Sequence, residues 1–183
     1  MNKLPQNFSL ERYGLFLRFV TEEDASFILS LRNDEKLGRY INKTSPTLDA
    51  QVEWTNSYKL REEQGTDYYF IFEKPQGNPL GVCRIYDITI NTFTIGSWLF
   101  KKDSPVGAAI LADIITRELA FELFPFSELL FDVKTDNTNV NRYQATYKPE
   151  ILCINHDTIF YRCPKENFEK YKKLHLRMFA PKI

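Results

Sequence analysis

Patterns typical of metal sites, disulfide frameworks and membrane spans are scarce in this chain. Its 183 residues include two histidines and three cysteines, Cys83, Cys153 and Cys163. The cysteines are odd in number and none stands at a C-x-x-C spacing, which argues against both a disulfide framework and a zinc site. We therefore expect no bound metal, and we expect the cysteines to be small buried residues of a reduced compartment.

Long apolar runs and an excess of one charge are also missing. No segment approaches the roughly 20 apolar residues of a membrane span, and the N-terminus lacks the apolar run of a signal peptide. Lysine plus arginine and aspartate plus glutamate each number 24, so the formal net charge is zero and broad binding to nucleic acid is not expected. We expect a cytoplasmic monomer or homodimer with neither a membrane nor a nucleic acid as partner.

The length favours one domain over residues 1–183, with a core over about 15–163 and a surface helix and tail over 164–183. Hydrophobic periodicity and turn residues predict the following elements in order. They are a strand at 15–20, helices at 21–33 and 47–63, strands at 68–73, 80–90 and 92–100, a helix at 107–124, a strand at 129–134, a helix at 137–147, strands at 151–155 and 158–163, and a surface helix at 166–173.

This order predicts an α/β (α+β) fold, in which one mixed, mostly antiparallel sheet of about seven strands carries helices on both faces. The candidate core positions of the second helix are Leu48, Val52 and Leu60. We expect His156, in a hairpin turn, and His175, in the tail, to lie at the surface.

The stretch from Phe93 to Ala120 passes from a strand to a helix through a loop of small residues. The strand part is rich in β-branched and aromatic residues, whereas Ile110, Ile114 and Leu119 recur near helical spacing. Gly107 lies at the start of the helix and leaves the backbone there nearly bare. Unpaired N–H groups and the positive end of the helix dipole suit an anion such as a phosphate, although an ordinary strand-to-helix connection is the alternative.

The element order and this stretch resemble the GNAT superfamily of N-acetyltransferases over nearly the whole predicted core. In that family, the loop after the fourth strand carries an Arg/Gln-x-x-Gly-x-Gly/Ala signature that binds the pyrophosphate of acetyl-CoA. The residues that fall on the signature are Ser104, Pro105, Val106, Gly107, Ala108 and Ala109. Gly107 and Ala109 match, whereas Ser104 replaces the usual Arg or Gln and Pro105 removes one backbone N–H donor. The resemblance implies acetyl-CoA as co-substrate, held mostly by backbone N–H groups.

The resemblance also implies where the thioester is handled. In the family, a bulge in the fourth strand turns backbone N–H groups toward the thioester carbonyl and the pantetheine arm. Ser97, Trp98 and Leu99 occupy that place, and Gly96 before them permits a close approach.

Acetyl transfer further needs a base for the amine and an acid for the leaving thiolate. The segment that begins at Asp136 looks like the family segment in which an Asn opens a helix and a Tyr or His seven residues later approaches the sulfur. Asn137 fits the first position, but the later position holds Gln144, which could orient a water. Tyr143, one residue earlier and rotated by about 100° on a helix, is the candidate acid, with packing as its alternative. Asp87, late in the strand at 80–90, is the candidate base, with a solvated strand-end carboxylate as its alternative.

Further matches, among them the L-R-N-D-E segment that begins at Leu31, resemble the branch that acetylates nucleotide-linked amino sugars and, less closely, the ribosomal-protein branch. Arg32, Asn33 and Arg84 are candidate substrate contacts, and Trp54 is a candidate wall of the acceptor site. The alternatives are capping or ion pairing for Arg32 and core packing for Trp54.

The resemblance therefore implies an acetyl-CoA-dependent N-acetyltransferase that acts on the primary amine of a small molecule. A nucleotide-linked amino sugar is the expected substrate. A protein N-terminus as acceptor, or a catalytically silent module that binds acyl-CoA, are the alternatives.

Overall fold

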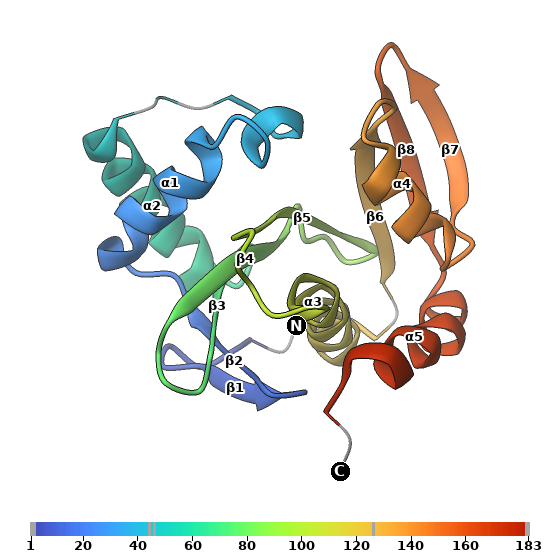
Figure 1. The fold of residues 1–183 in the computed structure, drawn as a ribbon, viewed down its shortest axis with the longest axis horizontal. Helices are drawn as coiled ribbons and strands as arrows, with labels where there is room; N and C mark the ends of the chain where they lie inside the picture. Colours follow the sequence, from blue (N-terminus) through green and yellow to red (C-terminus); the bar gives the residue numbers. More distant parts are fainter. Residues whose placement is uncertain (1–2, 44, 46, 126, 182–183) are drawn as a thin grey trace.

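The computed structural model describes residues 3–43, 45, 47–125 and 127–181, which fold around one sheet of eight strands in the order β1-β2-β3-β4-β5-β6-β8-β7 (Figure 1). The strands are β1 (Ser9–Arg12), β2 (Leu15–Phe19), β3 (Tyr68–Glu73), β4 (Pro79–Tyr86), β5 (Thr92–Phe100), β6 (Glu128–Lys134), β7 (Glu150–Asn155) and β8 (Thr158–Cys163). The helices are α1 (Ala25–Asn33), α2 (Leu48–Gln64), α3 (Ala108–Leu123), α4 (Thr138–Ala145) and α5 (Lys165–Phe179), with short 3₁₀ turns at Glu22–Asp24 and Gly38–Tyr40.

Two hydrophobic clusters lie on opposite faces of the sheet. In β3, Tyr68, Phe70 and Phe72 belong to the cluster that packs against α3, whereas Tyr69 and Ile71 belong to the one that packs against α1 and α2. Every residue of β3 is buried, because successive side chains of a strand point to opposite faces and both are covered. The predicted mixed α/β fold with helices on both faces is confirmed.

The sheet divides between β5 and β6, its one parallel pair among the described strands. Only Thr92–Thr94 of β5 pairs with Glu128–Leu130 of β6. Beyond Thr94, β5 continues as a partner of β4 while β6 continues as a partner of β8. The two halves therefore diverge, with α1 and α2 beside one half and α4 beside the other (Figure 1).

The prediction of about seven strands missed β1, which pairs with β2 at one edge of the sheet. Its four residues, SLER, are exposed or half-buried and have no apolar run that would mark a strand. The tight turn between β1 and β2 holds Tyr13 and Gly14, both at positive φ, as two-residue hairpin turns require. The strand conformation of β1 therefore depends on its pairing with β2, and the residue pattern of β1 does not predict it.

The predicted core positions of α2 are wrong. Leu48 is 48% exposed and Leu60 is 63% exposed, and Val52 is only half-buried. The buried residues of the helix are Gln51, Thr55, Tyr58 and Glu62. Their side chains hydrogen-bond among themselves and to the sheet: the Tyr58 hydroxyl contacts Glu62 and accepts from the Tyr69 N–H at 2.8 Å. A polar side chain can face the core when a partner satisfies it, which hydrophobic periodicity cannot detect.

Three other expectations are corrected. β4 ends at Tyr86 rather than near residue 90, because Asp87 has a φ of 50° that turns the chain. His175 is not at the surface: α5 extends to Phe179, and the imidazole is 6% exposed with Nε2 2.8 Å from Thr146 Oγ1. Burial lowers the pKa of this imidazole.

Cys153 is exposed on β7, whereas Cys83 and Cys163 are buried as expected. Within the described part of the chain, no helix is both long and apolar enough to span a bilayer.

Candidate active site

A β-bulge interrupts β5 just past the point where β5 and β6 separate. Val82 of β4 pairs with Leu99, and Arg84 pairs with Gly96, so Ser97 and Trp98 together oppose the single residue between them on β4. Ser97 has a φ of 49°, which fits the extra residue of a bulge. A bulge is therefore present within the predicted segment Ser97–Leu99, at Ser97 and Trp98, and it lies where the two half-sheets diverge.

The loop between β5 and α3 has the bare backbone that the sequence predicts. Gly107 is the N-cap residue of α3 with a φ of 83°, a left-handed conformation that L side chains rarely adopt. Among the hydrogen bonds of the described residues, none uses the N–H of Val106, Gly107 or Ala109, whereas the Ala108 N–H donates to Pro105 O. Val106 is 90% exposed. The free N–H groups at this helix start fit an anion such as a pyrophosphate.

Ser104 does not replace the missing Arg or Gln of the signature. Its hydroxyl donates to the backbone O of Leu80 at 3.3 Å and so ties the loop to the start of β4. Binding of a pyrophosphate here would depend on backbone donors and on the loop keeping its shape.

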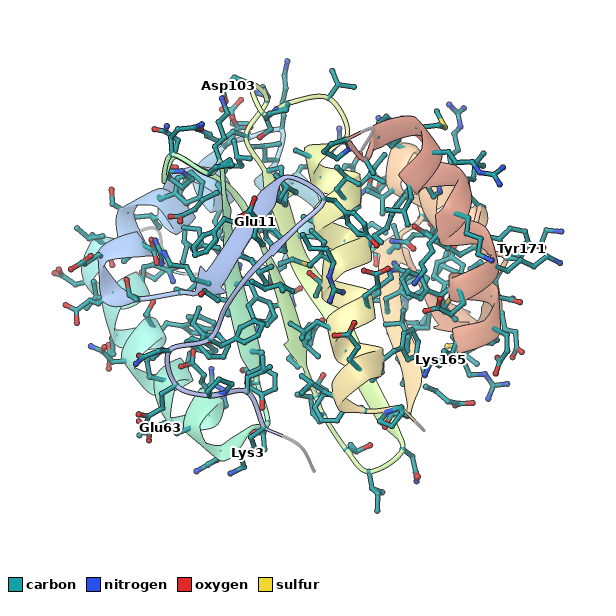
Figure 2. The ribbon with its side chains drawn as sticks, turned by 90° about the horizontal axis from the view of Figure 1, so that it is seen from below. Lys3, Glu11, Glu63, Asp103, Lys165 and Tyr171 are labelled. Atoms are coloured by element: carbon teal, nitrogen blue, oxygen red, sulfur yellow. The ribbon has the colours of Figure 1, made fainter. Side chains whose placement is uncertain are left out.

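The end of α5 supports this loop from behind. A Cβ atom added to Gly107 would lie 2.4 Å from Phe179 Cδ1, so the Phe179 ring packs directly on the glycine. Figure 2 shows α3 and α5 side by side, and the end of α5 beyond Tyr171 lies toward the loop that carries Asp103. The sequence pattern predicts a separate surface helix for the tail and does not predict this contact, because nothing local in the sequence pairs residues 72 positions apart.

Trp98 links the bulge to the start of α3. Its indole Nε1 donates to the backbone O of Ala109 at 2.8 Å, and its ring centroid lies 5.3 Å from that of Tyr143 on α4. The bulge, the first turn of α3 and α4 are therefore held as one unit.

Asn137 is the N-cap of α4, as predicted, and its Oδ1 accepts from the Val140 N–H at 3.5 Å. The two candidate catalytic residues of this helix point into a buried network. Tyr143 donates its hydroxyl proton to Asp113 Oδ2 at 2.6 Å, and Gln144, 5% exposed, accepts from Arg117 Nη2 at 2.7 Å. Burial and the nearby Asp113 carboxylate raise the pKa of Tyr143 well above its ordinary value. Gln144 therefore faces the core, and Tyr143 stays protonated beside Trp98 with its hydroxyl bonded to Asp113.

A cavity of about 580 Å³ lies between the α1–α2 side and β6. Its wall includes Gly96 and Ser97 of the bulge and three of the four predicted substrate contacts: Arg32, Trp54 and Arg84. Asn33 is exposed and is not one of the lining residues. The connection between α1 and α2 also contributes to the wall, through Tyr40, Ile41, Asn42 and Ser45.

The Arg84 guanidinium is fixed by its neighbours. Nε donates to Asp67 Oδ1 at 2.7 Å, Nη2 donates to the other oxygen, and the guanidinium carbon lies 5.1 Å from the Trp54 ring centroid and 4.7 Å from that of Tyr86. Trp54 itself stacks on Tyr58. Such a rigid, partly desolvated guanidinium is well suited to bind a phosphate group.

The charged lining of the cavity is mostly positive. Among the described lining residues, Arg32, Arg84 and Lys134 are cationic and Asp132 is anionic. Arg32 Nη2 also donates to Asn42 O at 2.8 Å, which ties the α1–α2 connection to α1. This balance favours a substrate that carries negative charge.

The predicted base, Asp87, is exposed and is not among the lining residues of the cavity. Asp132 on β6 does line the cavity. The residue is exposed overall, but partial burial of its carboxyl group raises the pKa of that group. The sequence pattern alone does not single out Asp132 as a site residue. The alternation of β6, which buries Leu129, Phe131 and Val133 on the α3 face, does place Asp132 on the opposite face. The sequence pattern does not show that this face of β6 borders a cavity, because the cavity exists only where β5 and β6 diverge. No metal-ligand cluster of three or more His, Cys, Asp or Glu occurs among the described residues.

Several solved structures share this architecture. Apo FdhC, a nucleotide-linked sugar GNAT, is 32% identical to this chain, with a TM-score of 0.83 and coverage of 95% of this chain and 99% of the other. RimJ from Mycobacterium smegmatis in complex with CoA-disulfide is 16% identical, with a TM-score of 0.76 and coverage of 94% and 93%. The ribosomal-protein-S5-alanine acetyltransferase from Vibrio fischeri is 16% identical, with a TM-score of 0.70 and coverage of 85% and 96%.

A search of curated protein sequences gave no significant match. The family model described as the acetyltransferase (GNAT) domain matches residues 14–145, which include the bulge, the glycine loop, both arginines of the cavity and the start of α4. The chain belongs to the GNAT family of acetyltransferases.

Proposed function

We propose that this protein transfers the acetyl group of acetyl-CoA to the primary amine of a nucleotide-linked amino sugar. The observation that carries this proposal is the mostly cationic cavity that borders the bulge of β5, with Arg32 and Arg84 in its wall. Support also comes from FdhC, the nucleotide-linked sugar GNAT, which is 32% identical and aligns over nearly the full length of both chains. A peptide N-terminus, the alternative acceptor, would bring a positive charge but no phosphate to these arginines.

In this proposal, each part of the site has one task. The N–H groups of Val106, Gly107 and Ala109 hold the pyrophosphate of acetyl-CoA, with Ala108 as the first residue of the helix behind them. The backbone of Ser97–Leu99 holds the pantetheine arm and polarises the thioester carbonyl.

The other residues that the sequence predicts as site residues have the following roles in this proposal. Asn137 caps the start of α4, and Tyr143 of the same helix packs against Trp98. Arg32 and Arg84 bind the phosphates of the sugar nucleotide, and Trp54 forms the wall behind them. Tyr143 reaches a thiolate only if its hydroxyl leaves Asp113, so Asp113 competes with any role of Tyr143 as an acid.

The proposal is tested with acetyl-CoA and a panel of acceptors. Calorimetric titration with acetyl-CoA is expected to give a binding isotherm, and acetylation of dTDP- and UDP-linked amino sugars is expected to exceed that of N-terminal peptides. If acetyl-CoA at millimolar concentration produced no binding heat and no thermal shift, acetyl-CoA would be ruled out as the co-substrate. Binding of acetyl-CoA without turnover of any amine in the panel would instead favour a catalytically silent acyl-CoA-binding module.

Replacing Arg32 by alanine is expected to raise the KM for the sugar nucleotide about 10-fold to 100-fold, because a charge-assisted hydrogen bond contributes about 1.5–3 kcal/mol. The KM for acetyl-CoA should not change. Steady-state kinetics with each substrate varied in turn measures the effect. Arg39→Ala is the matched control, since Arg39 is an exposed arginine of the same connection that pairs with Asp136 and does not line the cavity. Equal effects of the two substitutions would contradict a specific phosphate contact. Arg84 is less suitable, because its removal would leave the buried Asp67 carboxylate with Arg61 alone.

A further inference from the structure

Asp132 carries the one carboxylate among the described residues that line the cavity. It lies on β6 and pairs in register with Phe160 of β8, whereas Arg32 and Arg84 belong to α1 and β4 on the other side of the divergence. The cavity is therefore lined by positive charge alone on the α1–β4 side. The β6 side carries both the Asp132 carboxylate and Lys134, whose Nζ donates to Asp157 Oδ1 at 2.9 Å.

This distribution of charge suits a substrate with two unlike ends. A nucleotide-linked amino sugar has a diphosphate at one end and an ammonium group at the other. The ammonium group is repelled by Arg32 and Arg84 and attracted by Asp132, so the cavity orients the amine toward β6. Ser97 of the bulge, which borders the same cavity, places this amine near the position proposed for the thioester.

The amine must lose a proton before it can attack. Amines of this kind have a pKa of about 8 to 10, so at neutral pH the bound form is the ammonium ion. A base works best when its own pKa lies near the working pH, and burial moves the pKa of Asp132 upward from that of an ordinary carboxyl. Tyr143 and Gln144 cannot take this role because their polar groups are bonded to Asp113 and Arg117.

We infer that Asp132 is the catalytic base that accepts a proton from the substrate ammonium group, an inference that rests on the proposed function. The Asp132 carboxylate takes one proton, and the nitrogen lone pair then forms the C–N bond to the acetyl carbon. The C–S bond breaks with its electron pair on sulfur, and the second nitrogen proton passes to the thiolate. The products are the acetamide and free CoA, and Asp132 releases its proton to solvent.

The groups around Asp132 come from four elements. Lys134 lies on the same face of β6 and pairs with Asp157 and with Thr158 of β8. Its positive charge lowers the pKa of Asp132, against the larger upward effect of burial. Arg84 and Tyr86 of β4 and Tyr40 of the α1–α2 connection border the same cavity. Burial raises the pKa of Tyr86 to about 12, and the negative charge of Asp132 contributes to that shift.

The test measures kcat/KM for a dTDP-linked amino sugar between about pH 5 and about pH 10 in wild type and Asp132→Asn. In wild type, a plateau is expected between the pKa of Asp132 and that of the amine, because carboxylate and ammonium coexist there. In Asp132→Asn only the neutral amine reacts, so the rate should fall about 100-fold at pH 7 and rise about tenfold per pH unit up to the amine pKa. Addition of formate to Asp132→Ala should restore part of the rate at pH 7.

Glu128→Gln is the matched control, because Glu128 is a carboxylate on the same strand that pairs with Arg162 and does not line the cavity. Asp87→Asn tests the base expected from the sequence. A wild-type plateau retained in Asp132→Asn, a uniform loss at all pH values, or the sloped profile in Asp87→Asn instead would overturn the inference while leaving the proposed function standing. If wild type itself acetylates no amine of the panel, the proposed function fails and this inference fails with it.

Discussion

Gly107→Ala is expected to abolish measurable binding of acetyl-CoA under conditions that saturate the wild-type protein. Gly107 has a φ of 83°, and an L residue in a left-handed conformation costs about 1–2 kcal/mol. The new methyl carbon would also lie 2.4 Å from Phe179 Cδ1, so the loop, the ring or both must move. Displacement of the free N–H groups at the start of α3 would remove several charge-assisted bonds of about 1.5–3 kcal/mol each. Calorimetric titration with acetyl-CoA, together with thermal denaturation, measures both effects.

The two causes can be separated with Phe179→Ala. This substitution removes the ring but not the backbone strain, so Gly107→Ala/Phe179→Ala should recover only part of the lost affinity. Met178→Ala is the control, because Met178 is an exposed large side chain next to Phe179. Wild-type affinity in Gly107→Ala would show that the loop does not need its left-handed residue. Full recovery in the double variant would show that the contact with Phe179 is the whole cause.

The parts of the site that sequence analysis predicted correctly are those set by local backbone chemistry. The strand, the bulge at Ser97, the glycine at the start of α3 and the Asn137 cap depend on residues within a few positions of one another. Glycine and asparagine at such positions have few alternative roles, so their spacing alone is informative.

The parts that were missed depend on contacts between distant segments. Asp132 becomes a lining residue only because β5 and β6 diverge, and Phe179 reaches Gly107 only because α5 packs on α3. Gln144 and Tyr143 illustrate the same limit, since the helical spacing of α4 was correct but the partners on α3 that bind them could not be known. Periodicity reports which residues share a face, and it does not report what that face meets.

Asp113→Ala is expected to destabilise the fold by about 3–5 kcal/mol, because it leaves the buried Arg117 guanidinium without its counter-charge. Arg117 Nε lies 2.9 Å from Asp113 Oδ2, as an ion pair without a well-formed hydrogen bond, and its Nη1 has no hydrogen-bond partner among the described residues. The guanidinium otherwise lies over the ring of Tyr147 at 4.8 Å. Asp113→Ala would also free the Tyr143 hydroxyl, so α4 should loosen against α3. Urea denaturation followed by circular dichroism measures the loss.

A double replacement distinguishes an unpaired charge from lost packing. Asp113→Leu/Arg117→Met removes both charges at similar volume and should recover much of the stability lost in Asp113→Ala, since apolar replacements of buried ion pairs are often close to neutral. Glu169→Ala, which removes the exposed partner of Lys172, should change the free energy of unfolding by less than about 1 kcal/mol. An Asp113→Ala variant that lost no more free energy of unfolding than Glu169→Ala would contradict this prediction. Water would then have to reach the Arg117 guanidinium between α3 and α4. Gly107 caps α3, and Tyr143 of α4 packs against Trp98 of the bulge. Asp113→Ala, which loosens α3 against α4, should therefore also weaken acetyl-CoA binding, whereas Glu169→Ala should not.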